Sequence, residues 1–182
     1  PPHPPTGPAI SLFADLVDPT ALTERLGDTA FREKARQLDD ATRKAIRDAN
    51  GTPIEGKLLG DGVLAVFTAA RDAITAALAC RDASRATGLE LHLGLHAGDV
   101  IREDNNVYGG AVNIAARIAS APAPGAVLVS DTVRSLPRTS AGCRCTDRSD
   151  TALHAHEWPS HAAAEFPGAA RGTTRLMRPA MR

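Results

Sequence analysis

Aromatic side chains are scarce in this 182-residue chain, where Phe, Trp and Tyr together make up 3 % of the residues. Hydrophobic residues still account for 43 %, so the core must be built mainly from Ala, Leu, Val and Ile. A sheet with so few aromatic rings offers no platform for stacking bases, which argues against an RNA-recognition domain. The length suits one α/β domain with a sizeable core and is too short for two.

Net charge and long apolar runs are also lacking. The 21 basic and 21 acidic residues cancel, which argues against a broad surface for nucleic acid or anionic membrane. No apolar run approaches the ~18 residues of a membrane span, and Pro1–Pro8 lacks the charged-then-apolar order of a signal peptide. Cys80, Cys143 and Cys145 are an odd number without framework spacing. We therefore expect a soluble cytoplasmic domain that binds neither nucleic acid nor membrane.

The apolar pattern predicts an α+β fold. Apolar runs and alternation indicate strands, and a 3.6-residue period indicates helices. We expect strands over Ile10–Leu16, Pro53–Leu59, Val63–Phe67, Leu89–Leu95 and Ala126–Val129, and helices over Asp28–Asn50, Thr68–Arg85 and Gly109–Ser120. A tight hairpin mixed with long crossovers favours a ferredoxin-like sandwich: a mixed or antiparallel sheet with helices packed on one of its faces.

Composition divides the chain into three parts. Residues 1–9 are proline-rich and are predicted to be a flexible lead-in. Residues 10–140 carry the periodic pattern and are predicted to be the folded domain. Residues 141–182 are rich in Ala, Arg, His and Pro without clear periodicity, so we assign them as a divergent tail of no predictable regular structure.

Two aspartates stand at the ends of predicted strands. Asp15 lies near the end of the first strand, and Asp61 lies at a hairpin tip between Gly60 and Gly62. If that hairpin lies beside the first strand, the two carboxylates converge, as a hard cation such as Mg²⁺ requires. An aspartate between glycines is also a common turn residue, and this alternative stays open on the pattern alone.

A second polar cluster lies on the helix that follows Gly109-Gly110. Asn113 and Arg117 are four residues apart and therefore share one helical face, with small alanines between them. An amide donor and a guanidinium on one face can hold a ribose or phosphate oxygen as charge develops on it. The alternative is an ordinary helix with a solvated arginine.

Taken together, these segments resemble the class III adenylate/guanylate cyclases, most closely the bacterial adenylate cyclases. The resemblance runs from about Ile10 to Ser135, in the order and spacing of the family. It is carried by four stretches: LFADL (12–16), KLLGDG (57–62), LGLHAG (93–98) and YGGAVNIAAR (108–117). It implies the fold of the class III catalytic domain and a nucleotide cyclase that converts ATP to 3′,5′-cyclic AMP and pyrophosphate.

The resemblance also implies the residues of the metal site and the catalytic pair. Asp15 and Asp61 match the aspartates that hold two divalent ions, Mg²⁺ or Mn²⁺. Asn113 matches the asparagine that positions the ribose, and Arg117 the arginine that stabilises the charged transition state. In this family the aspartates of one subunit face the asparagine and arginine of another. A homodimer is therefore implied as the active form.

Base recognition is assigned by the same resemblance. Lys57 matches the lysine that reads adenine. Asn106 falls where adenine-selecting members often carry Asp or Thr, and its amide can accept from the adenine amino group and donate to the ring. ATP is therefore the expected substrate.

Two departures keep a rival interpretation open. Asp18-Pro19 stands where the family often has Gly followed by Phe or Ser, which adds a negative charge and removes a backbone N–H. In the tail, Leu153-His154-Ala155 lacks the usual phosphate-contacting lysine. The rival is a degenerate cyclase-homology module that dimerises and binds nucleotide with little turnover.

Overall fold

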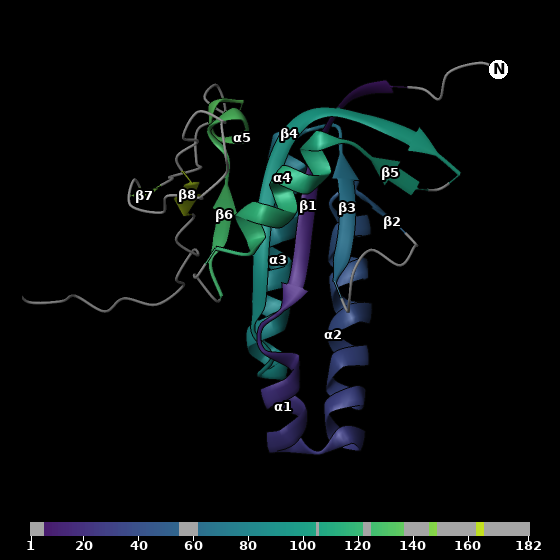
Figure 1. The fold of residues 1–182 in the computed structure, drawn as a ribbon, viewed down its shortest axis with the longest axis vertical. Helices are drawn as coiled ribbons and strands as arrows, with labels where there is room; N and C mark the ends of the chain where they lie inside the picture. The colour runs from purple at the N-terminus through teal and green to yellow at the C-terminus, as the bar shows by residue number, and fades with distance from the viewer. Residues whose placement is uncertain are drawn as a thin grey trace, which may run out of the picture.

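The computed structural model shows one mixed sheet with helices on both faces (Figure 1). It describes residues 6–54, 62–104, 106–121 and 125–136, and the backbone of 146–148 and 163–165. The strand order is β2-β3-β1-β4-β6-β8-β7, with β5 paired to β4. In chain order the elements are β1 (Thr6–Leu16), α1 (Pro19–Leu26), α2 (Asp28–Asp48), β2 (Thr52–Ile54), β3 (Val63–Phe67), α3 (Ala70–Thr87), β4 (Leu91–Glu103), β5 (Asn106–Tyr108), α4 (Gly110–Ala119), β6 (Val127–Val129), α5 (Asp131–Ser135), β7 (Thr146–Arg148) and β8 (Ala163–Glu165).

The main core lies between the sheet and the helices α2 and α3. Alternate residues of β1 (Ile10, Leu12, Ala14 and Leu16) face these helices and are all buried. The helices contribute Leu38 and Ile46 from α2 and a run of small residues around Ala77 from α3. These alanines compensate for the shortage of aromatic rings, because small side chains let a helix pack closely on a sheet. The α+β prediction is confirmed.

The opposite face of the sheet is covered by α4, so the helices do not all lie on one face as expected (Figure 1). The close approach depends on Gly94 in β4: a Cβ there would lie 2.4 Å from Ala115 O and 2.4 Å from Ala119 N. Side chains larger than hydrogen at this point of the strand would exclude the helix. A second, smaller core forms beneath it and includes Val100, Val107 and Val112.

The two central strands are longer than predicted. Thr6–Ala9 were assigned to the lead-in, yet they form the start of β1 and pair with Gly98–Ile101 of β4. The apolar alternation that marks Leu89–Leu95 fades beyond it, because β4 becomes mostly exposed after His96 and ends as a hairpin arm that pairs with β5 over residues 101–103 (Figure 1). Backbone pairing rather than side-chain pattern extends both strands.

Five elements of the structure were absent from the sequence prediction, namely α1, β5, α5, β7 and β8. The helix α1 starts at Pro19, which occupies the first helical turn, and packs against α2. In the segment assigned as a divergent tail, β8 pairs antiparallel with β6, and β7 pairs with β8. Within the part of the chain that the structure describes, no helix combines the length and apolar character needed to cross a membrane.

Candidate active site

Asp15 lies near the end of β1, on the same sheet face as α4. Its neighbours Ala14 and Leu16 point into the main core, so the alternation of the strand turns the Asp15 carboxylate to the other side. The side chain is half-buried, and its Oδ1 accepts a hydrogen bond of 3.0 Å from the Leu16 N–H. A carboxylate held on a rigid strand by a backbone donor is pre-oriented for a ligand.

The end of the β2–β3 connection meets Asp15. A Cβ on Gly62, the residue after Asp61, would lie 3.4 Å from Asp15 Oδ1. The pairing of Ala14 with Val63 in the β1–β3 ladder sets this approach. The expected neighbourhood of the first strand and the hairpin is therefore present. The side chains of Asp61 and Lys57 lie outside the described residues.

Asn113 and Arg117 lie on the outer side of α4. The helix buries Ala111, Val112, Ala115, Ile118 and Ala119 against the sheet, whereas Asn113 and Arg117 are both exposed. Their shared face, predicted from the spacing, thus turns away from the sheet that carries Asp15. Within one chain, Asp15 therefore lies on the sheet side of α4, whereas Asn113 and Arg117 lie on the opposite, outer side of the helix.

Asn106 lies in β5, on the hairpin arm beside α4. Its Oδ1 accepts from the Val107 N–H at 2.9 Å, and its Nδ2 donates to the Tyr108 hydroxyl at 3.0 Å. It also lines a cavity of about 570 Å³ between the arm and β2. The other lining residues are Arg47, Thr52, Pro53, Ile54, Val66, Arg102, Glu103, Asp104 and Val107.

Two histidines on β4 were not assigned to the site by the sequence. His92 pairs directly with Asp15 across the β1–β4 ladder, and its Nδ1 is buried without a hydrogen-bond partner. His96 is buried, and its Nδ1 lies 2.9 Å from the hydroxyl of Ser130, the N-cap of α5. Its position indicates a role in the framework.

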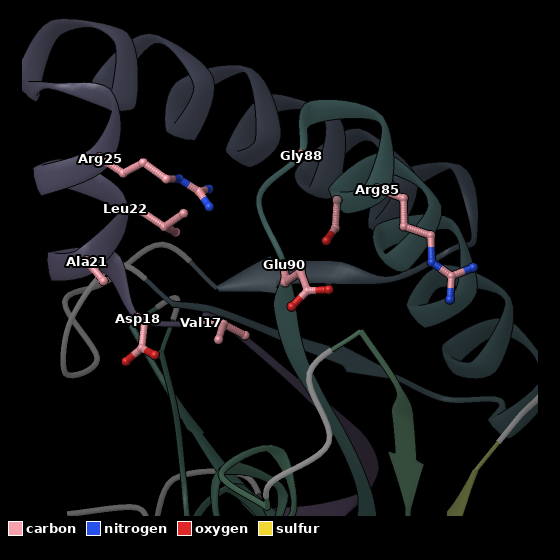
Figure 2. Close-up of a pocket in the computed structure, with 9 residues that line it drawn as sticks. Val17, Asp18, Ala21, Leu22, Arg25, Arg85, Gly88 and Glu90 are labelled. Atoms are coloured by element: carbon pink, nitrogen blue, oxygen red, sulfur yellow. The ribbon is translucent and has the colours of Figure 1, made fainter.

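A second cavity lies beside the β1–α1 connection, between α1 and the end of α3 (Figure 2). It measures about 550 Å³, and its lining includes Asp18, three residues after Asp15. Arg25 extends over the cavity, whereas Arg85 points away from it (Figure 2). The remaining lining residues are Val17, Ala21, Leu22, Ser84, Gly88 and Glu90. None of the predicted site residues lines this cavity.

The arrangement can be compared with known proteins. Residues 4–163 match the family described as the adenylate and guanylate cyclase catalytic domain. The chain belongs to this family. The cyclase domain is also 31 % identical over 126 residues to an uncharacterized protein of Mycobacterium tuberculosis. That match covers 68 % of this chain and 33 % of the relative, so the chain spans about a third of the relative's length.

Solved structures support the same assignment. The adenylate/guanylate cyclase/hydrolase from Silicibacter pomeroyi is 27 % identical, with a TM-score of 0.72 over 91 % of this chain and 99 % of that one. The adenylyl cyclase CyaB from P. aeruginosa shares the fold, with a TM-score of 0.73 at 23 % identity over 93 % and 98 % of the two chains. The predicted sheet and its helices are those of a class III cyclase catalytic domain.

The donor atoms at Asp15 suit a divalent cation. Asp15 offers carboxylate oxygen, the donor that Mg²⁺ and Mn²⁺ prefer, and Gly62 leaves space beside it. Among the described residues, no group of three or more His, Cys, Asp or Glu side chains could hold a metal ion. A complete site therefore requires groups beyond these residues, of which Asp61 is the predicted one.

Proposed function

We propose that the protein is an adenylate cyclase whose active site forms between two copies of the chain. The proposal rests on one observation: Asp15 faces the α4 side of the sheet, whereas Asn113 and Arg117 lie on the outer face of α4. Neither half can complete a site alone. A second copy related by twofold symmetry supplies the missing half to each, giving two equivalent sites.

The reaction needs positioning and charge stabilisation. The ribose 3′-oxygen of ATP bonds to the α-phosphorus, the bond to the bridging oxygen breaks, and pyrophosphate leaves while the hydroxyl proton passes to solvent. Two divalent ions, held by Asp15 and Asp61, would activate the hydroxyl and neutralise the triphosphate. Asn113 orients the ribose, and Arg117 stabilises the charge that develops on the phosphoryl oxygens.

The proposed substrate is ATP, which the site would select by recognising adenine. Lys57 supplies a donor, which pairs with the unprotonated N1 of adenine and is mismatched with the N1–H of guanine. Mispairing a buried polar group costs about 1–3 kcal/mol, which corresponds to roughly 5- to 150-fold in discrimination. The chemistry of the substrate and the absence of a disulfide framework favour the cytoplasm as its compartment.

The decisive experiment measures cyclic AMP and pyrophosphate formed from Mn²⁺ and ATP. We expect equimolar products, and we expect Asp15→Asn to abolish them because it removes a metal-holding charge without changing side-chain volume. Asp40→Asn, on the exposed face of α2, is the matched control and should keep full activity. Turnover of GTP equal to that of ATP would contradict the choice of base.

The rival function is a cyclase-homology module that binds nucleotide with little turnover. Asp18 favours it: this residue, three positions after Asp15, occupies the N-cap position of α1 in the left-handed conformation, φ 45°, and its exposed carboxylate makes no capping hydrogen bond. Pro19 then removes the N–H that would open the helix. Binding of ATP without cyclic AMP, in protein that is dimeric and contains Mn²⁺, would establish the rival and overturn the enzyme.

A further inference from the structure

The hairpin arm carries a side-chain pair that no motif indicated. Asn106 and Tyr108 are two residues apart in β5 and therefore lie on the same side of the strand. Val107 between them turns to the other side and is 3 % exposed in the core beneath α4. The ring of Tyr108 is 46 % exposed and pairs across the hairpin with Ile101.

The hydrogen bonds of this pair fix the orientation of the Asn106 amide. The Val107 N–H can only donate, so the amide atom at 2.9 Å from it must be the oxygen, Oδ1. The amino nitrogen Nδ2 then donates to the Tyr108 hydroxyl oxygen at 3.0 Å. A rotation of the amide by half a turn would set the Nδ2 amino group against the Val107 N–H, donor against donor. The amide therefore cannot exchange its donor and acceptor ends to suit the base.

The same contacts leave the Tyr108 hydroxyl with a proton to give. A phenol oxygen that accepts a hydrogen bond keeps its own O–H as a donor. This donor lies beside Asn106, at the exposed surface of the arm. Purines differ at this kind of contact: the 6-oxo group of guanine accepts a hydrogen bond, whereas the 6-amino group of adenine donates one.

We propose that Tyr108 is a second base-selecting residue, which accepts a hydrogen bond from the Asn106 amide and presents a donor that favours a 6-oxo purine. The inference rests on the proposed function, in which Asn106 reads the base. It predicts that the ATP preference set by Lys57 is partly offset by Tyr108. The domain then discriminates between ATP and GTP less sharply than a site whose side chain at position 106 can only accept hydrogen bonds.

The test is Tyr108→Phe, which keeps the ring against Ile101 and removes only the hydroxyl. We expect the ratio of kcat/KM for ATP to that for GTP to rise roughly two- to tenfold, the factor that one neutral hydrogen bond supplies. The rise should come mainly from loss of GTP turnover. An unchanged ratio, or equal loss with both nucleotides, would overturn the proposal.

Asn106→Asp provides the control background. A carboxylate has no N–H to give to Tyr108, so the phenol donates its proton to it and has none left for a base. Asn106→Asp should therefore raise the ATP:GTP ratio by itself, and Tyr108→Phe should add nothing to it. An equal effect of Tyr108→Phe in both backgrounds would show a merely structural role and overturn the proposal.

Equilibrium binding separates this inference from the proposed function. ATP and GTP are each used to displace N-methylanthraniloyl-ATP in the presence of Mn²⁺. If the unmodified protein binds both but cyclises neither, the proposed function fails, and the ratio of the two dissociation constants tests Tyr108 in its place. Tyr108→Phe should then raise the dissociation constant for GTP relative to that for ATP. If neither nucleotide displaces the probe, the inference is overturned as well.

Discussion

Gly62 lies in contact with Asp15 at the point where β3 begins beside the end of β1. A Cβ added to Gly62 would stand 3.1 Å from Ala14 O, 3.3 Å from Phe13 Cζ and 3.4 Å from Asp15 Oδ1. The space beside the proposed metal-holding carboxylate therefore depends on the absence of a side chain at this position.

Gly62→Ala should weaken the metal dependence of the reaction. The added methyl group crowds Asp15 and shifts its carboxylate, so we expect a higher Mn²⁺ concentration for half-maximal activity and a loss of about 1 kcal/mol in the free energy of unfolding. A manganese titration of activity and urea unfolding measure the two effects. Gly7→Ala is the control in β1, because nothing lies within 4 Å of its Cβ position. Equal manganese profiles for all three proteins would refute the relationship.

Gly94→Ala should disrupt the packing of α4 on β4. Its Cβ would meet backbone atoms of Ala115 and Ala119 at 2.4 Å, so the helix must move as a whole. We expect a loss of about 3 kcal/mol in the free energy of unfolding, together with most of the activity, because Asn113 and Arg117 move with α4. Gly110→Ala, at the start of α4 with open space around it, should leave both stability and activity intact. A stable and active Gly94→Ala variant would disprove the tight approach of α4 to β4.

Asp18 should lower both ATP affinity and local backbone stability. Asp18→Gly and Asp18→Ala both remove the charge near the proposed triphosphate, so both should lower the apparent KM for ATP, most clearly at low salt. Only glycine suits the φ of 45°, so Asp18→Gly should be about 1 kcal/mol more stable than Asp18→Ala. Thermal unfolding and a KM series over ionic strength measure this. A KM that rises in both variants would show that the carboxylate assists binding.

Cys80 should make the domain sensitive to alkaline pH. Burial raises the pKa of its thiol from 9.0 to about 12, because the thiolate would lose its hydration. Between pH 9 and 12 the unfolded chain loses this proton while the folded chain keeps it. The free energy of unfolding therefore falls by about 1.4 kcal/mol per pH unit from this group.

Cys80→Ala isolates that contribution. The variant should be less stable than the unmodified protein at pH 7, because it leaves a cavity. The deficit should shrink above pH 9, since alanine has no proton to lose. Urea unfolding of both proteins at pH 7, 9.5 and 10.5 measures the difference. A deficit that stays constant over this range would mean that the Cys80 thiol ionises alike in both states.

The sequence predicted the elements whose side chains carry a regular pattern. Ile10–Leu16 and Val63–Phe67 are strands because their apolar residues face the core, and the spacing of Asn113 and Arg117 correctly placed them on one face of a helix. The start of β1 was missed because Thr6–Ala9 are held by pairing with β4, which no local pattern reveals. The helix α1 was missed because Asp18-Pro19 was interpreted only as a departure from the family pattern, although proline is common in a first helical turn.

The candidate site was predictable where it depends on residue type and not where it depends on register. Asp15 could be recognised from its motif, but His92, opposite it in the ladder, could not, because pairing between distant strands is invisible in one sequence. The link between Asn106 and Tyr108 was missed for a different reason: it depends on side-chain orientation within β5. The strands β7 and β8, each three residues long, are too short to leave a periodic signal.

The shared site is tested most directly by mixing two inactive variants. Asp15→Ala lacks the metal-holding half, and Asn113→Ala lacks the ribose-holding half, so each homodimer should be inactive. A heterodimer has one site with both defects and one site with none. After unfolding and refolding together, the mixture should recover about a quarter of the normal activity, from half the dimers with one intact site each. A mixture as inactive as its parents, with heterodimers demonstrated by differential tags, would contradict the shared site.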